Sequence, residues 1–377
     1  MSADAPDVAI VGGGIVGCAL AAFLAEDGAR VRLYEREHLA AGASGRNSGL
    51  LQHPMDEALT AVYAASVALY EELGHGFELP AEPVGVLVVS EDAAALEPTR
   101  ADLAARFPEL RAEALDAATL HALEPALADG LAAVRLDTGL PVPPAAATEA
   151  FAARARAAGA ELNEGVAATP LIEDARATGV RTATGTEPAG AVVVAAGPWT
   201  SALIGNARTG VRLMPEGRLP ITALWGVNVE LRLARPPRHA VEEGGIQDLQ
   251  HADGELGPLF SLVTRDGVSA LGSTFLSEQP EPADVAPALV ARGTRFVPAL
   301  GGTHVVSVRA CARPMSADGR PLLGPVTGIA GLFVAAGHGP WGISLGPGSA
   351  RLVADAVLGR PAAIARELAT ARFRAAA

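Results

Sequence analysis

Three glycines near the start of the sequence have the spacing that suits the pyrophosphate of a dinucleotide. Gly12, Gly14 and Gly17 form the pattern G-x-G-x-x-G. The first glycine allows a tight turn, the second lets the backbone approach the phosphates, and the third lets a helix pack on a strand. Glu35 follows at the distance where an acid accepts hydrogen bonds from a ribose. The residues that complete this predicted site are Ile15, Val16 and Arg36.

The stretches around these glycines must form a strand, a helix and a second strand if they are to hold a dinucleotide. Residues 8–11 are an apolar run, an alanine-rich helical pattern follows to Glu26, and Gly28 stands where that helix should stop. A second apolar run, residues 31–34, leads directly into Glu35. A chain with 42 glycines can produce the pattern by chance, so this order of elements carries the interpretation.

The composition limits the classes of protein to which the chain can belong. Its 377 residues, 50% of them hydrophobic, suffice for about two domains, and a formal net charge of -13 argues against a nucleic-acid surface. Two cysteines cannot form a disulfide framework, and we expect no metal site. No signal peptide and no apolar run long enough to span a membrane is visible. We therefore expect a cytoplasmic protein, whose oligomeric state the sequence leaves open.

Four separated stretches together resemble one family, the D-amino-acid-oxidase-like FAD oxidoreductases. They are VAIVGGGIVG with the later YE, ASGRNSG, VVVAAGPWTSAL, and RPMSADGRPLLGPV with the following GLFVAAGHGPWGISLGPGSARLVADAVLG. The resemblance covers both ends and the middle of the chain, whereas residues 85–140 and 216–304 contain no matching motif. It implies FAD as the cofactor, with the ADP half held by the glycine pattern and Glu35.

The resemblance implies further contacts to FAD from three segments. A Gly/Ser-rich loop would run beside the pyrophosphate and the flavin, because small residues allow close approach and Arg46 offers a fork of donors. By itself this loop reads equally well as a flexible surface segment. Its residues are Ser44, Gly45, Arg46, Asn47, Ser48 and Gly49. Val166 would contact the adenine through its backbone, and Ala196 and Gly197 would end a strand against the cofactor.

The C-terminal stretch would hold the flavin ring. Its glycine-rich turn follows an apolar strand, and backbone N–H groups there can form a nest for the N1 edge of the flavin. The residues are Gly337, His338, Gly339, Gly342 and Ile343. Either the side chain of His338 touches the flavin or only its backbone does, and the sequence leaves both open.

Arg313 is the residue that the resemblance assigns to the substrate. In amino-acid-oxidising branches an Arg-Pro pair at this point binds the substrate carboxylate, since a guanidinium matches a carboxylate in a bidentate way. The alternative is a salt bridge to Asp318 or another acid. By family position Gln52 and His53 would lie beside the substrate, although a turn before a helix explains them as well. Cys311 stands where one branch attaches its flavin, so a covalent link is the alternative to an inert buried thiol.

Two sequence patterns alternate along the chain and predict the architecture. One is typical of a parallel α/β sheet, and the other is typical of an antiparallel sheet. We expect an α/β protein, α+β overall, in which a Rossmann-like FAD-binding domain with a parallel sheet is interleaved with an antiparallel-sheet substrate domain. The first comprises residues 1–84, 141–218 and 305–377, and the second comprises residues 85–140 and 219–304. Among single elements, we expect a helix over residues 56–73, a final helix over 349–358 and a loop over 309–326.

These features predict the FAD-dependent oxidation of a small amine or amino acid at its C–N bond. Hydride transfer to flavin N5 would give an imine that hydrolyses, a reaction that needs orientation more than a strong base. Two alternatives remain, the same oxidation of a 2-hydroxy acid and a flavin subunit of a larger complex. An NAD-dependent dehydrogenase would explain only the opening glycine pattern. The electron acceptor, oxygen or another carrier, is open, although Ala270 stands near a position where one branch has an oxygen-activating lysine.

Overall fold

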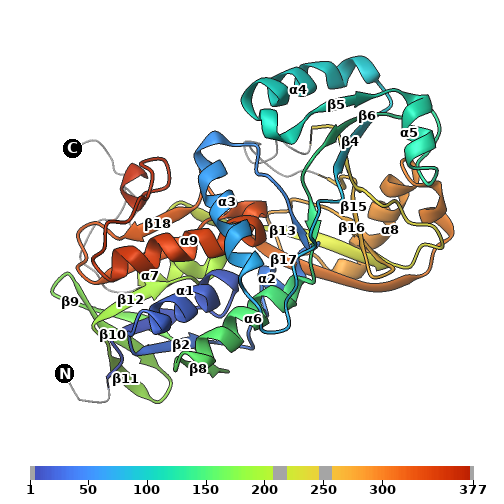
Figure 1. Cartoon of the computed structure of the whole chain (residues 1–377). Helices are drawn as coiled ribbons and strands as arrows, with labels where there is room; N and C mark the ends of the chain where they lie inside the picture. Colours follow the sequence, from blue (N-terminus) through green and yellow to red (C-terminus); the bar gives the residue numbers. More distant parts are fainter. Residues whose placement is uncertain (1–4, 207–218, 246–256, 374–377) are drawn as a thin grey trace.

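The computed structural model describes residues 5–206, 219–245 and 257–373 of the chain. Two large sheets dominate it, one mainly parallel and one mainly antiparallel. Figure 1 shows that each sheet has its own set of helices, with α1, α6 and α9 beside the first and α4, α5 and α8 at the far end of the molecule beside the second. Among the described residues, no helix has both the length and the apolar character needed to cross a bilayer.

The six-stranded sheet has the order β18-β19-β12-β1-β2-β8, and all neighbouring strands are parallel except β18 and β19. Its strands are β1 (Val8–Val11), β2 (Val31–Glu35), β8 (Glu161–Glu164), β12 (Ala191–Val194), β18 (Leu322–Pro325) and β19 (Leu332–Ala336). Both faces of the sheet are covered, so β1 is apolar and buried at every position.

Helices cover one face of this sheet and a small antiparallel sheet covers the other. The helices are α1 (Ile15–Glu26), α3 (Glu57–Glu71), α6 (Pro144–Ala157) and α9 (Gly342–Val357). The small sheet consists of β9 (Thr169–Glu173), β10 (Arg176–Thr182) and β11 (Gly185–Pro188). Val8 and Ile10 of β1 therefore join the core under the helices, whereas Ala9 and Val11 join the core under the small sheet.

Two glycines let α9 approach its neighbours closely. A Cβ at Gly346 would lie 3.0 Å from the side chain of Ile15 in α1, and one at Gly348 would lie 2.4 Å from the carbonyl oxygen of Val62 in α3. This packing offsets the poor helix propensity of glycine. It explains why α9 begins earlier than the predicted start at residue 349.

The eight-stranded sheet has the order β17-β13-β16-β15-β14-β4-β6-β5, and only β14 and β4 are parallel. Its strands are β4 (Val86–Ser90), β5 (Glu113–Leu115), β6 (Ala132–Leu136), β13 (Ile221–Leu231), β14 (Ala240–Glu243), β15 (Ser261–Arg265), β16 (Val268–Gly272) and β17 (Val305–Ser316). Its helices are α4 (Ala93–Arg106), α5 (Ala117–Leu123) and α8 (Pro282–Thr294). One face of the central strands packs with α8 in an apolar core.

The remaining elements are short. They are α2 (Ala43–Arg46), α7 (Thr200–Asn206), the paired strands β3 (Leu50–Leu51) and β7 (Leu140–Pro141), and the 3-10 helices η1 (Pro108–Leu110), η2 (Gly197–Trp199), η4 (Pro298–Gly302), η5 (Gly339–Trp341) and η6 (Thr370–Phe373). Several of them lie next to the cavity described below.

The predicted fold class is confirmed, as is the helix expected over residues 56–73, which is α3. The loop expected over 309–326 is wrong at both ends, because β17 continues to Ser316 and β18 already begins at Leu322. The charged residues and Pro314 of β17 interrupt the apolar pattern, but β17 is an edge strand, where proline is tolerated. β17 also pairs in the eight-stranded sheet, although we placed residues 305–377 with the other domain. The remaining domain boundaries stay a prediction.

Candidate active site

A cavity of about 830 Å³ separates the carboxyl ends of the parallel strands from one face of the large sheet. On one side it is lined by the turns that follow β1, β2, β12 and β19, and ligands of open α/β sheets bind at such strand ends. On the other side it is lined by side chains of β13, β14, β15 and β17. Strand β17 joins the two sides, because it contacts α2, η2 and η5.

The turn after β1 is built so that it needs glycine. Gly12 has a φ of 116°, and a Cβ there would lie 2.4 Å from the carbonyl oxygen of Ala195. A Cβ at Gly17 would lie 1.9 Å from the carbonyl oxygen of Gly12, so α1 can start against the turn only without a side chain at that point. The N-terminus of α1 therefore opens onto the cavity, where its free N–H groups suit a pyrophosphate.

Glu35 lines the cavity at the end of β2, as an acid that binds a ribose should. One carboxylate oxygen accepts a hydrogen bond from the N–H of Gly13 at 2.7 Å, and the other accepts one from the N–H of Glu37 at 3.0 Å. Each oxygen keeps a lone pair for a ribose hydroxyl. Beside it, the guanidinium of Arg36 lies 4.0 Å from the ring centre of Trp199, a cavity residue that we did not predict. These residues fit the ADP half of FAD.

The predicted Gly/Ser-rich loop contains the short helix α2, which is held from both ends. Ser44 accepts a hydrogen bond from the N–H of Ile15 at 3.0 Å. At the other end, the carbonyl oxygen of Arg46 accepts hydrogen bonds at 3.1 Å from Asn228 and from Arg309. Arg309 therefore supports the loop from β17, and the contacts place α2 between the glycine turn and the large sheet.

Most of the predicted cofactor residues line the cavity. These are Gly12, Gly14, Ile15, Val16, Glu35, Arg36, Ser44, Arg46, Asn47, Ser48, Ala196, Gly197, Cys311, His338, Gly339, Gly342 and Ile343. The others, which do not line it, are Gly17, Gly45, Gly49, Val166 and Gly337. These residues lie behind the cavity walls and position the residues that line them. Gly337, for example, turns the chain after β19 with a φ of 83°, and Val166 donates from its N–H to the carbonyl oxygen of Glu35 at 2.8 Å.

Arg313 lies on β17 with its guanidinium buried in the wall of the cavity. It donates to the carbonyl oxygen of Thr274 at 2.7 Å and to the hydroxyl of Ser273, and it lies 4.3 Å from the ring centre of Phe275. Gly226 on β13 leaves the space that the guanidinium fills, since a Cβ there would lie 2.3 Å from one of its nitrogens. The guanidinium is therefore fixed in orientation by groups that do not neutralise its charge.

No acid pairs with Arg313 among the residues that the structure describes. The alternative partner, Asp318, is bound to Arg372 at 2.7 Å instead. Burial lowers the pKa of Arg313 below its ordinary value, but a guanidinium keeps its proton in a protein. A buried charge is costly unless it is paired, so this cation suits an anionic group of a ligand, such as a carboxylate.

His338 follows β19 and is a second buried polar group of the cavity. Its Nε2 atom has no hydrogen-bond partner among the described residues. Burial lowers the pKa of His338 to about 4, so the imidazole is neutral at neutral pH. It is therefore placed to exchange a hydrogen bond with a ligand rather than to carry charge.

The structure separates the two residues predicted beside the substrate. Gln52 lines the cavity, and its Nε2 atom donates to Glu242 of β14 at 3.2 Å. His53 lies behind it, with its ring centre 5.4 Å from that of Tyr63 and 4.9 Å from that of Phe107, and it does not line the cavity. Burial also lowers the pKa of His53. Its place is that of a neutral packed side chain.

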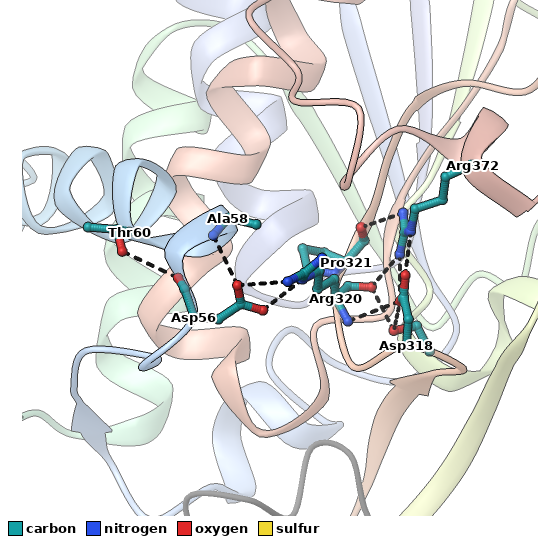
Figure 2. Close-up of polar contacts among 8 residues, drawn as sticks. Asp56, Ala58, Thr60, Asp318, Arg320, Pro321 and Arg372 are labelled. Atoms are coloured by element: carbon teal, nitrogen blue, oxygen red, sulfur yellow. Dashed lines mark hydrogen bonds and ion pairs between the residues drawn. The ribbon is translucent and has the colours of Figure 1, made fainter. Parts of the chain in front are cut away.

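Ion pairs hold the turn after Gln52 against the loop after β17 (Figure 2). Asp56, the N-cap residue of α3, accepts two hydrogen bonds from Arg320, at 2.7 and 3.1 Å. Asp318, in the same loop as Arg320, accepts two from Arg372 of η6, at 2.7 and 2.9 Å. These contacts fix two segments beside the cavity relative to each other.

Both cysteines are free thiols. Burial raises the pKa of Cys311, which lines the cavity, although the positive charges of Arg313 and Arg309 act in the opposite direction. Burial raises the pKa of Cys18 in α1 to about 12. Among the described residues, no three His, Cys, Asp or Glu side chains are grouped as a metal site would require.

Several cavity residues in the large sheet and in the segment that follows β16 were not predicted. They are Trp225, Asn228, Glu242, Ser261, Ser273, Phe275 and Gln279. The available signal was the alternation in β13, where Gly226 and Asn228 face the cavity side and Val227 and Val229 face the apolar core. Such alternation marks a face of a sheet, but it does not reveal what that face binds.

Known proteins resemble this chain, two of the three below over nearly its whole length. It is 26% identical to the glycine oxidase of Bacillus licheniformis over 370 residues, which is 94% of each protein. It is 32% identical over 233 residues to the D-amino acid dehydrogenase of Rhizobium johnstonii, covering 60% of this chain and 51% of that one. The crystal structure of iminodiacetate oxidase from Chelativorans sp. BNC1 superposes with a TM-score of 0.82 at 25% identity, covering 96% of this chain and 98% of that one. A family model described as FAD dependent oxidoreductase matches residues 7–356, so the chain belongs to this family of FAD-dependent oxidoreductases, as the four motifs indicated.

Proposed function

We propose that the protein oxidises the C–N bond of a small amine or amino acid. The observation that carries this proposal is the buried guanidinium of Arg313, which lines the cavity with no acid partner among the described residues. The names of the relatives, glycine oxidase, D-amino acid dehydrogenase and iminodiacetate oxidase, support the same class of substrate.

The residues around the cavity fit FAD. The glycine turn, the N-terminus of α1 and Glu35 would hold the ADP half, and the start of α9 with Gly339 and Gly342 would face the flavin ring. When bound, FAD supplies the two-electron acceptor for a hydride from the carbon next to the substrate nitrogen. The resulting imine hydrolyses in water.

The side chains of this chain orient the substrate. Arg313 binds the carboxylate with two parallel hydrogen bonds, which fixes the direction of the adjacent C–H bond. The neutral imidazole of His338 can accept a hydrogen bond from an amine N–H. No strong base is required, because the step depends on orientation and on a neutral amine rather than on proton abstraction from carbon.

The test is anaerobic reduction of the bound flavin by amines, by D- and L-amino acids and by 2-hydroxy acids of the same skeleton. Amino acids should bleach the flavin absorbance, and the matched hydroxy acids should not. Bleaching by hydroxy acids alone would overturn C–N oxidation in favour of the first alternative. If no small molecule bleaches the flavin, the remaining explanation is a flavin subunit that works within a complex.

Two finer questions belong to this proposal. A covalent link from Cys311 to the flavin is tested by acid precipitation, after which the flavin stays with the protein or is released. The acceptor, oxygen or another carrier, is tested by comparing oxygen consumption with dye reduction on the same substrate. A cytoplasmic location remains a prediction from the sequence.

A further inference from the structure

The segment that follows β16 runs beside β13 with one residue more than a regular ladder allows. Val229 of β13 pairs with Leu271, and Trp225 pairs with Leu276. Between these two pairs β13 has three residues, whereas the opposite segment, residues 272–275, has four, which is a β-bulge. We term this four-residue stretch the bulge segment. A bulge bends its strand and changes the direction in which side chains point, often beside an active site.

The bulge segment is fastened to its neighbours on both sides. The hydroxyl of Thr274 donates to the carbonyl oxygen of Trp225 at 3.2 Å and accepts from the N–H of Val227 at 3.1 Å, so it bridges the gap in the ladder. Toward β15, Ser273 exchanges two backbone hydrogen bonds with Leu259, at 2.7 and 2.9 Å. The groups that the bulge segment presents to the cavity therefore have fixed positions.

Arg313 reaches across β13 to the bulge segment. It stands on β17, and β13 lies between β17 and β16 in the sheet. The guanidinium passes over Gly226, where a Cβ would lie 2.3–2.4 Å from both terminal nitrogens and from Cζ. It donates to the carbonyl oxygen of Thr274 at 2.7 Å and to the hydroxyl of Ser273, and its Cζ lies 4.3 Å from the ring centre of Phe275. These four residues form the arginine seat.

The arginine seat leaves part of the guanidinium available to a ligand. A guanidinium has five N–H bonds, and the hydrogen bonds to the bulge segment use two of them. The directions of the other N–H bonds are set by the seat, so a carboxylate that accepts two of them is oriented as well. An error of about 1 Å in the place of a reacting group can cost on the order of 100-fold in rate. The seat is therefore placed to affect the reaction without touching the substrate.

We infer that the bulge segment positions Arg313 for the reaction, with Ser273 and Phe275 as positioning residues and Gly226 as the residue that leaves the necessary space. A change of Ser273 or Phe275 leaves the charge that binds the carboxylate and removes its fixed direction, so it slows oxidation more than it weakens binding. A side chain at Gly226 displaces the guanidinium itself. The inference rests on the proposed function, because it takes Arg313 as the anchor of the substrate carboxylate.

The first experiment measures by calorimetry how the FAD-loaded protein binds propionate, a carboxylate without a C–N bond to oxidise. A methyl group at position 226 would occupy the place of the guanidinium, so Gly226→Ala should bind propionate at least about tenfold more weakly, as should Arg313→Ala. The control is Gly244→Ala after β14, where the atom nearest to the added Cβ would lie 3.6 Å away, and its affinity should stay within about twofold. Wild-type affinity in Gly226→Ala would overturn the inference.

The second experiment follows anaerobic flavin reduction at increasing concentrations of an amino acid, which yields a maximum rate and an apparent Kd. Ser273→Ala should lower the maximum rate by about 10- to 100-fold and change the Kd by less than about threefold. Phe275→Leu should also lower the rate, and Phe275→Tyr, which keeps the ring, should retain it. The control Ser269→Ala removes another buried hydroxyl, bonded to Thr264 at 2.8 Å, and should change neither quantity more than about twofold.

The outcomes separate this inference from the proposed function. An unchanged maximum rate in Ser273→Ala, or an equal loss of rate in Ser269→Ala, would overturn the inference, even if Gly226→Ala does not fold. The proposed function stands in that case, because an amino acid has reduced the flavin. If no amino acid reduces the flavin but propionate binds, the proposed function fails, and Gly226→Ala still decides whether the arginine seat exists. If the wild type does not bind propionate, Arg313 is not a carboxylate anchor and the inference fails.

Discussion

The wall of the cavity at the ends of the parallel strands consists largely of backbone, with glycines such as Gly12 and Gly14 where a Cβ would collide. The opposite wall consists of side chains, among them Arg313 and Glu242, carried by strands that alternate between core and cavity. A wall made of backbone allows only a few residue types, because a side chain would collide there. A wall made of side chains can be built from many residue types. The cofactor side can therefore be recognised in the sequence as a motif. On the substrate side, the residue types can differ from one relative to the next.

The largest effect is expected from a side chain added to the backbone wall. In Gly17→Ala the Cβ would lie 1.9 Å from the carbonyl oxygen of Gly12, so α1 has to move away from the turn. We expect loss of bound flavin and of about 3 kcal/mol or more in the free energy of unfolding, measured by flavin absorbance and thermal unfolding. The matched control is Gly28→Ala, where φ is 91° and no atom lies within 4 Å of the added Cβ. This control should lower the free energy of unfolding by about 1 kcal/mol and retain the flavin. Equal loss of flavin in both variants would contradict the proposed role of the glycine turn.

The next effect concerns the side-chain wall. Arg313→Ala should raise KM for a carboxylate substrate by roughly 30- to 1,000-fold, equivalent to about 2–4 kcal/mol, while the flavin content stays unchanged. Steady-state kinetics and the flavin-to-protein ratio measure the two quantities separately. Arg295→Ala, which removes only an exposed ion pair with Glu91, is the control. An unchanged KM in Arg313→Ala would remove the carboxylate site, and loss of flavin would show that the two walls are not independent.

A smaller effect is expected from His338, which the two walls enclose. The pKa of its imidazole is lowered to about 4 in the folded protein, against 6.5 ordinarily. As pH falls through this window, the unfolded chain binds a proton that the folded protein does not, so stability is lost. At about pH 5 the loss from this group is on the order of 2 kcal/mol. In His338→Gln, the urea midpoint should fall less between about pH 7 and pH 5 than in the wild type. A fall of the same size in both proteins would show that His338 is not the group responsible.

The smallest effect is expected behind the walls, at the ion pairs of Figure 2. Burial would raise the pKa of Asp318, but the hydrogen bonds and charge of Arg372 outweigh it and hold this pKa below its ordinary value. Arg372→Ala should lower the free energy of unfolding by about 1–2 kcal/mol, with KM and flavin content retained. Chemical unfolding and kinetics on the same sample measure both. A rise in KM as large as that of Arg313→Ala would mean that this network positions the substrate wall.

The cofactor half could be predicted from the sequence because its residues are restricted by backbone geometry. Gly12 and Gly17 leave no alternative residue at their positions, and Glu35 stands at the end of the next strand. In the Gly/Ser-rich loop, the hydroxyl of Ser44 touches the start of α1, and its contact with FAD stays a prediction. His53 does not line the cavity, because adjacency in sequence to Gln52 does not decide which side chain faces it.

The substrate half could not be predicted, for a physical reason. Glu242 and Asn228 come to line the cavity only because their strands pair with other segments of the chain. β17 was expected to end early because charged residues interrupt its apolar pattern, yet Arg313 faces the cavity and Arg309 is held by Glu230 and by the carbonyl oxygen of Arg46. A polar residue within a strand of this kind looks the same in sequence as a residue of a loop.

The order of the parallel sheet has a consequence for how the protein is made. β1 lies between β2 and β12, and β12 lies beside β19, so neighbours in space are made at very different times. The glycine turn after β1 leaves the ribosome early, but the carbonyl group of Ala195 that packs against it follows after roughly half of the chain, and β19 emerges later still. A nascent chain therefore carries the recognisable motif long before it can hold a nucleotide. FAD can therefore be bound only late in biosynthesis, after β12 and β19 have been made.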